Sequence, residues 1–197
     1  MRVCIVGSGG REHALAHVLS RGVEVVVTPG NPGIPGSVVT PPEELEADLF
    51  VIGPEQPLVD GLADRLRRRG NLVFGPGADG ARLEGSKAWM KELLAEAGVP
   101  TAHHGTFTDR AEALAHLDQM EDLFVLKTDG LAAGKGVLVT GDRSQAAEAV
   151  GEYLSGEAFG DAGRRIVIEE GLSGPELSVL AVCDGTTAVP LVPAQDF

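Results

Sequence analysis

The first part of the chain repeats one pattern: a short apolar run ends in a loop of glycine and proline, and a helical pattern follows. Continuous apolar runs are typical of strands buried on both faces, and their alternation with helices is typical of a doubly wound parallel sheet. The runs that we interpret as strands cover residues 2–6, 23–28, 49–52 and 72–74. The sequence therefore predicts an α/β fold that begins with an open parallel sheet and binds ligands through the loops after its strands.

The first of these loops, residues 7–10, joins a strand directly to a helix predicted over 11–20. Backbone N–H groups and the helix dipole bind anions at such a helix start, so this turn is expected to hold a phosphate. The dinucleotide fingerprint fails, because its third glycine would fall on Glu12 and the second strand ends in Thr-Pro instead of an acidic residue. We therefore expect phosphate binding here without NAD.

A helix predicted from Ser86, which can cap it, to about residue 97 ends at a Gly-Val-Pro sequence. We place the domain boundary there, which gives a first domain over 1–99 and a second over 100–197. The remaining predicted elements are helices at 59–69, 109–119 and 144–154, a strand at 165–169, and a β-hairpin over 177–192 that turns at Asp184-Gly185.

The segment from Phe124 to Thr140 combines two apolar runs with a connection that is rich in glycine and carries lysine. Glycine lets backbone N–H groups approach an anion closely, and lysine supplies positive charge that this acidic chain otherwise lacks. The P-loop pattern does not fit, because Gly136 stands where a hydroxyl residue is required and a strand-like run follows. We interpret the segment as a hairpin that binds phosphate; a plain glycine turn with two surface lysines is the alternative.

Composition narrows the classes of function. The net charge of −13 opposes general binding to nucleic acids or membrane surfaces, which depends on a positive field. No apolar run reaches the roughly 20 residues of a membrane span, so a cytoplasmic protein is expected. Cys4 and Cys183 lie far apart and are interpreted as buried free thiols, not as a disulfide or zinc site. His13 and His17 have a spacing that can bind metal, but packing or solvent exposure is favoured because the sequence shows no third ligand.

Several motifs agree in order and spacing with one family. They are residues 6–14, 29–31, 53–55, 83–87, 127–137 and 168–170. Together they closely resemble glycinamide ribonucleotide synthetase, the phosphoribosylamine–glycine ligase family of the ATP-grasp superfamily, and the resemblance covers essentially the whole chain. Thr128 replaces the alanine that is usual in the Lys-Ala-Asp-Gly motif, and Pro32 replaces a small residue. Neither change removes a charged group.

The resemblance implies a Rossmann-like first domain, an ATP-grasp lid at about 120–173 and the start of the catalytic core at about 174–197. It implies that ATP phosphorylates the carboxylate of glycine and that the amine of 5-phosphoribosylamine attacks the glycyl phosphate, giving glycinamide ribonucleotide, ADP and phosphate. The expected substrates and cofactors are ATP, Mg²⁺, glycine and 5-phosphoribosylamine. The enzyme is expected to be a monomer and to act in purine biosynthesis. The family's Mg²⁺ ligands are expected beyond Phe197, so no metal ligand or catalytic residue is assigned and the chain alone is expected to be inactive.

By the same resemblance, two groups of residues bind substrates. ATP is expected to contact Lys87, Lys127, Gly130, Gly134, Lys135, Gly136, Glu169, Glu170, Leu172 and Glu176. In this group, the loop from Gly130 to Gly136 closes over the triphosphate and Glu176 binds the ribose. 5-Phosphoribosylamine is expected to contact Gly9, Gly10, Arg11, Glu12, Pro29, Gly30, Asn31 and Glu55.

Two alternatives stay open. One is another ATP-grasp enzyme, such as a different carboxylate–amine ligase, a purine-pathway carboxylase or a biotin-dependent carboxylase, although residues 9–12 and 83–87 speak against it. The other is a non-catalytic nucleotide-binding module, which would need no metal ligands. Phosphate release with glycine and phosphoribosylamine, compared with release with bicarbonate, separates the ligase from a carboxylase.

Overall fold

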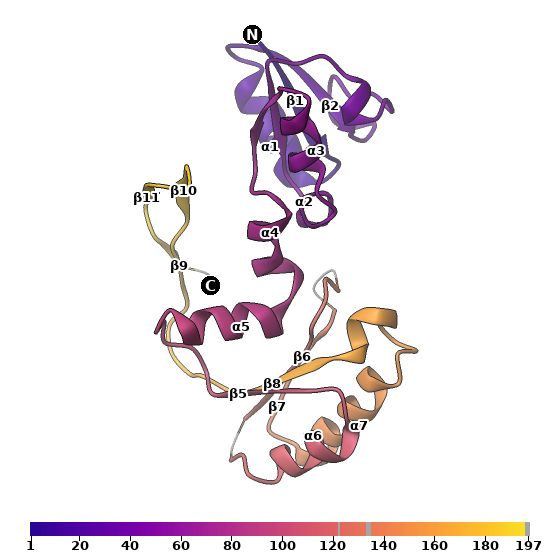
Figure 1. The fold of residues 1–197 in the computed structure, drawn as a ribbon, viewed down its shortest axis with the longest axis vertical. Coiled ribbons are helices and arrows are strands. Elements are labelled where there is room, and N and C mark those ends of the chain that lie inside the picture. Colours follow the sequence, from indigo (N-terminus) through magenta and orange to yellow (C-terminus); the bar gives the residue numbers. More distant parts are fainter. Residues whose placement is uncertain (122, 133–134, 196–197) are drawn as a thin grey trace.

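The computed structural model describes residues 1–121, 123–132 and 135–195, and its first part is built on a parallel sheet (Figure 1). The strands are β1 (Arg2–Gly7), β2 (Glu24–Pro29), β3 (Leu49–Ile52) and β4 (Leu72–Phe74), in the order β2-β1-β3-β4. The helices of this part are α1 (Gly10–Leu19), the 3-10 turn η1 (Pro42–Glu44), α2 (Glu55–Val59) and α3 (Leu62–Arg68). All neighbouring strands pair in parallel, as predicted. The strand order reverses between β1 and β3, and the ends of strands at such a point are where open α/β sheets bind ligands.

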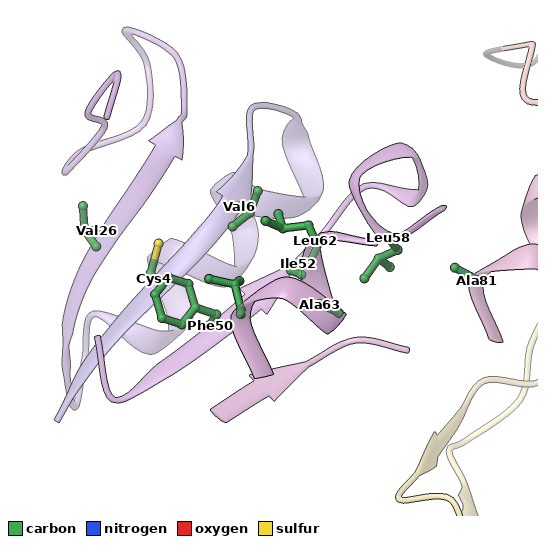
Figure 2. Packing of buried hydrophobic residues seen from close by; sticks show 10 residues of the cluster. Cys4, Val6, Val26, Phe50, Ile52, Leu58, Leu62, Ala63 and Ala81 are labelled. Carbon is green, nitrogen blue, oxygen red and sulfur yellow. The ribbon is translucent and has the colours of Figure 1, made fainter. Parts of the chain in front are cut away.

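Both faces of this sheet are covered, which explains its continuous apolar runs. On one face Cys4 packs with Leu62 of α3 in the buried cluster shown in Figure 2. On the other face Val3 and Ile5 pack with Ala16 of α1. Alternate residues of β1 thus point to opposite sides of the sheet, and each side is closed by helices.

The helix predicted over 59–69 is wrong as a single element. The structure has α2, which ends at Val59, and α3, which begins at Leu62. Gly61 between them has a φ of 76°, in the left-handed region where a right-handed helix cannot continue. Since α2 begins at Glu55, this residue lies in the first turn of a helix.

Two consecutive helices, α4 (Ala78–Gly85) and α5 (Lys87–Glu96), connect the first sheet to the rest of the chain (Figure 1). The sequence does not predict α4, but α5 begins as predicted, because Oγ of Ser86 accepts a hydrogen bond from the backbone N–H of Trp89. α4 packs against α2 and α5 packs against a strand of the second sheet. The domain boundary at residue 99 stays a prediction.

The second sheet is antiparallel and has the order β5-β8-β6-β7. Its strands are β5 (His104–Phe107), β6 (Phe124–Thr128), β7 (Val137–Thr140) and β8 (Ile166–Glu170), accompanied by α6 (Arg110–Leu117), α7 (Arg143–Leu154) and the 3-10 turn η2 (Gly160–Arg164). The pairing of β6 with β7 confirms the predicted hairpin, whereas β5 is not predicted. Leu126 and Ile168 pack with the helices in one core. Lys127 and Glu169 follow them along their strands, so their side chains leave the opposite face, the face toward α5.

After β8 the chain continues as an extended ribbon of short strands (Figure 1). They are β9 (Leu177–Ser178), β10 (Ala181–Cys183), β11 (Ala188–Pro190) and β12 (Ala194–Gln195), with β10 paired to β11 and β9 to β12. The turn at Asp184-Gly185 is confirmed, since Oδ1 of Asp184 accepts hydrogen bonds from two backbone N–H groups beyond it. No helix of the described ranges is long and apolar enough to cross a bilayer.

The two cysteines differ in environment. Cys4 is buried, as predicted, and burial raises the pKa of its thiol to about 11. Cys183 is exposed, so its interpretation as a buried thiol is wrong. The physical reason is that every described residue from 172 to 195 is exposed, because the ribbon packs too lightly on other described residues to bury a side chain.

Candidate functional site

A cavity of about 550 Å³ lies where α4 and α5 face the second sheet. Lys87 of α5, Lys127 of β6, Gly136 before β7 and Glu169 of β8 line it, and Glu55 of α2 reaches it from the first domain. The first four are predicted to bind ATP, and Glu55 is predicted to bind 5-phosphoribosylamine. The structure thus brings together five predicted residues that are distant in sequence.

Lys127 and Glu169 face the cavity from neighbouring strands. Nζ of Lys127 lies 3.1 Å from Oε2 of Glu169, and the same oxygen lies 3.1 Å from Nζ of Lys91 in α5. The side chain of Lys127 is 28% exposed, whereas those of Glu169 and Lys91 are 6% and 4% exposed. A buried lysine therefore balances the carboxylate from behind. The sequence does not predict this role for Lys91, because a lysine inside a helix gives no signal by itself.

Lys87 is the first residue of α5, and its side chain crosses to the connection of the β6–β7 hairpin. Its Nζ donates a hydrogen bond to the backbone oxygen of Gly130 at 3.0 Å. Partial burial lowers the pKa of Lys87, and the charge of Lys127 lowers it further, although Asp129 opposes the shift. Two lysines thus concentrate positive charge at one wall of the cavity, which favours an anion there.

Asp129 fastens the hairpin connection to α5, a role that the sequence does not predict. Its Oδ1 accepts hydrogen bonds from Oγ of Ser86 at 2.9 Å and from the N–H of Ala88 at 2.8 Å. Its Oδ2 lies 3.5 Å from Nη1 of Arg165, and its backbone oxygen accepts a hydrogen bond from the N–H of Lys87. Asp129 therefore caps α5 and fixes Lys87 against the connection.

The glycines of the connection stand where a side chain would collide. A Cβ on Gly136 would clash with Oγ1 of Thr128, and one on Gly130 would lie 2.7 Å from an alanine side chain of η2. Lys135 is exposed to solvent. Gly134 lies outside the described residues.

The residues that follow Glu169 have other contacts. Oε1 of Glu170 accepts a hydrogen bond from the backbone N–H of His103 at 2.8 Å, and the backbone N–H of Glu170 donates to the backbone oxygen of His103. These two bonds connect β8 to the start of β5. Leu172 and Glu176 are exposed and lie away from the cavity lining. The contacts of all three residues with ATP stay predictions.

The second group of predicted residues meets at the ends of β1 and β3. Glu12 is buried there, and its Oε2 accepts a hydrogen bond from the N–H of Gly9 at 2.6 Å. A Cβ on Gly53 would collide with the same carboxylate. Nη1 of Arg11 donates to the oxygen of Gly53 and to Oε1 of Glu55, the latter at 3.0 Å. A hydrogen bond from its own backbone, together with Arg11, holds the pKa of Glu55 below its ordinary value.

The loop after β2 lies beside the end of β1. Nδ2 of Asn31 donates to the backbone oxygen of Ser8 at 2.7 Å, which joins the loop to the turn where Gly10 begins α1. Residues 29–31 line a hollow of about 430 Å³. The second group therefore gathers at one end of the parallel sheet, and Glu55 connects it to the cavity that holds the two lysines.

His13 and His17 lie one turn apart on α1 and line a separate cavity of about 220 Å³. In the described ranges, no group of three or more His, Cys, Asp or Glu side chains is placed to hold a metal ion.

Two family models match consecutive parts of the chain. Residues 1–84 match the N domain of phosphoribosylglycinamide synthetase, and residues 85–197 match its ATP-grasp (A) domain. The chain belongs to the phosphoribosylglycinamide synthetase family. These two matches confirm the resemblance drawn from the motifs. They also confirm the predicted fold class, a doubly wound sheet followed by the beginning of an ATP-grasp fold.

Named relatives of this chain agree with the family. It is 44% identical over 215 residues to the phosphoribosylamine–glycine ligase of Xanthomonas campestris pv. campestris and 46% identical over 214 residues to that of Synechocystis. Each match covers 100% of this chain and 50% of the relative. The crystal structure of the ligase from Thermotoga maritima is 33% identical with a TM-score of 0.83, covering 98% of this chain and 49% of that one. The chain thus spans about half the length of the curated relatives it matches.

Proposed function

We propose that the full-length gene product is a phosphoribosylamine–glycine ligase that uses ATP to join glycine to 5-phosphoribosylamine. The observation that carries this proposal is the single cavity faced by Lys87 and Lys127 beside the glycine-rich hairpin connection. Phosphoryl transfer depends on placing and neutralising the phosphates more than on a protein nucleophile, and this arrangement suits both needs. The named relatives are the basis for the choice of substrates.

In the proposed reaction, a carboxylate oxygen of glycine attacks the γ-phosphorus of ATP, which releases ADP and forms glycyl phosphate. The amine of 5-phosphoribosylamine then attacks the acyl carbon, phosphate leaves, and glycinamide ribonucleotide forms. Lys87 and Lys127 would hold the phosphates of ATP through charge and hydrogen bonds. The loop over residues 130–136 would shield the acyl phosphate from water, which would otherwise hydrolyse it.

The two substrate sites would share a border at Glu55. We assign ATP to the cavity with Lys87 and Lys127, and 5-phosphoribosylamine to the end of the parallel sheet where Arg11 and Asn31 lie. Since Glu55 lines the cavity and pairs with Arg11, it would face the region where the two substrates meet. The proposed ligase reaction would belong to purine biosynthesis.

Magnesium, which would screen the phosphate charges, requires several oxygen ligands. The described residues form no acidic group of that kind, so they do not fit the ion and we derive no step through it. We further propose a cytoplasmic monomer that binds neither nucleic acid nor membranes, in keeping with the net charge of −13.

The test measures phosphate release by the full-length gene product with ATP, glycine and 5-phosphoribosylamine. A parallel reaction replaces glycine with bicarbonate. Release that requires both glycine and phosphoribosylamine supports the ligase, whereas release that requires bicarbonate indicates an ATP-grasp carboxylase. Bound ATP without release under either condition indicates a nucleotide-binding module.

Lys127→Ala should raise the KM for ATP by about tenfold or more, because it removes a charge-assisted contact to phosphate. Arg164→Ala is the matched control, since Arg164 is 78% exposed and pairs only with an exposed aspartate among the described residues. An unchanged KM in Lys127→Ala would remove Lys127 from the site. The 197-residue chain alone is expected to release no phosphate, and turnover by it would overturn that part of the proposal.

A further inference from the structure

Lys91 is a buried charged residue to which the proposed reaction gives no role. It lies on α5, its side chain is 4% exposed, and it is set behind the cavity lining. Its Nζ lies 3.1 Å from Oε2 of Glu169 and 2.6 Å from Oγ1 of Thr101. A lysine this deeply buried is rare and requires a paired charge. Glu169 is that partner, which links Lys91 to the wall of the proposed ATP site.

The shared oxygen makes Lys91 and Lys127 partners of one carboxylate. Oε2 of Glu169 lies 3.1 Å from both ammonium groups, and Oε1 is buried without a hydrogen-bond partner among the described atoms. Two positive charges and one negative charge leave one positive charge in excess. Because Lys91 is enclosed and Lys127 is 28% exposed on the cavity, the excess charge is presented to the cavity by Lys127.

The positions of the lysines in the sequence also associate Lys91 with the cavity. The sequence has twelve arginines but only four lysines, at positions 87, 91, 127 and 135. Two of them line the cavity, and a third stands on the hairpin connection. The ammonium of lysine is a compact point charge, whereas the planar guanidinium of arginine suits paired, two-bond contacts. Each lysine of the sequence thus lies on the cavity lining, on the hairpin connection or, in the case of Lys91, beside a carboxylate of the lining.

We propose that Lys91 is a positioning residue for ATP: by balancing Glu169 from behind, it leaves the charge of Lys127 available to a phosphate of the nucleotide. Without Lys91, Glu169 and Lys127 form a one-to-one ion pair, and this pair offers the phosphate no net charge. The inference rests on the proposed ATP site and concerns its charge, not the reaction that follows.

The experiment compares ATP with adenosine, which has the same base and sugar but no phosphate. Both are titrated against a fluorescent ATP analogue bound to the full-length gene product, in the wild type, in Lys91→Met and in Lys91→Met/Glu169→Gln. The measured quantity is the dissociation constant for adenosine divided by that for ATP. This ratio reports the charge beside the phosphates, because a loss of folded protein or of contacts to adenine affects both ligands alike. Thr101→Val is the control, since it removes the hydrogen bond to Lys91 and keeps the charge.

In Lys91→Met we expect the affinity for ATP to fall about tenfold and that for adenosine to change by less than about twofold. The double variant again leaves one positive charge in excess, so its ratio should return to within about threefold of the wild type. Thr101→Val should keep the wild-type ratio.

An unchanged ratio in Lys91→Met, or an equal loss of both ligands, overturns the proposal. If Lys91→Met does not fold, the double variant decides, because it removes the buried ion pair as a unit. A ratio near the wild type then supports the proposal, and one about tenfold lower overturns it. If the wild type binds no ATP, the proposed function fails and this inference fails with it. If the wild type binds ATP but the ratio does not change in Lys91→Met, only the role of Lys91 fails.

Discussion

The chemistry of Lys87 depends directly on its surroundings. Burial, with Lys127 adding to the effect, lowers its pKa from the ordinary value of 10.5, so Lys87 loses its proton at a lower pH in the folded protein than in the unfolded chain. Between the lowered pKa and 10.5 the unfolded chain binds more protons, so this residue makes the free energy of unfolding rise with pH. Phosphate binding has the opposite dependence, because it requires the protonated lysine.

We therefore expect the affinity of the full-length gene product for ATP to fall as the pH rises toward 10.5, beginning below the range in which an ordinary lysine titrates. Lys87→Arg should flatten this fall, because arginine keeps its charge throughout that range. Titration calorimetry at a series of pH values, with both proteins, measures the effect. An equally steep fall in Lys87→Arg would show that a different group is responsible.

The sequence predicts which residues carry charge and glycine at the site, but not how they pair. Lys87 and Lys127 stand in recognisable motifs, and the structure brings them to one cavity. Asp129 and Lys91 are different, because their roles come from contacts with residues far along the chain. Those contacts exist only once α5 packs on the second sheet, and no local pattern contains that information.

The start of α5 is the element on which the geometry of the site depends. Its first turn is held by Asp129, which accepts hydrogen bonds from Ser86 and Ala88. In α7, the first turn is held by its N-cap residue Asp142, which accepts hydrogen bonds from the N–H groups of Ser144 and Gln145. Both aspartates accept hydrogen bonds from the first turn of a helix, but only Asp129 lies beside a lysine of the cavity.

Asp129→Ala and Asp142→Ala should each lower the free energy of unfolding by about 1–2 kcal/mol, because each removes side-chain hydrogen bonds to backbone N–H groups in the first turn of a helix. Only Asp129→Ala should also weaken ATP binding, since Lys87 loses its fixed place against the hairpin connection. Urea unfolding and ATP titration of both variants measure the two effects. Equal ATP affinities in the two variants would mean that Lys87 is positioned without Asp129.

Strong periodic patterns predict the elements well, whereas short elements with glycine do not. The parallel strands and the β6–β7 hairpin follow from apolar runs bounded by turn residues. α4 is missed because Gly80 and Gly85 weaken its helical pattern, and β5 is missed because it opens with His104 and Gly105. In both cases packing against neighbouring elements outweighs local preference.

At the scale of the whole molecule, the chain has separate buried clusters in its two parts. Leu66 belongs to a cluster of the parallel sheet, and Leu126 belongs to the cluster of the antiparallel sheet. Between them, the guanidinium of Arg82 on α4 lies 4.6 Å from the ring centroid of Trp89 on α5. The helix that ends at Gly-Val-Pro predicts a boundary between two domains, but the place where the cores separate depends on how α4 and α5 pack.

We expect Leu66→Ala and Leu126→Ala to destabilise different parts of the molecule. Both side chains are fully buried, so each substitution should cost about 2–5 kcal/mol. In calorimetry of the 197-residue chain, each variant should lower the temperature of a different unfolding transition, and hydrogen exchange by peptide should assign it to one sheet. Val139→Ala, at a 56% exposed position of β7, is the control and should shift neither by much. If both leucine variants instead shift one common transition equally, the contacts of α5 with Asp129 couple the two cores into a single cooperative unit.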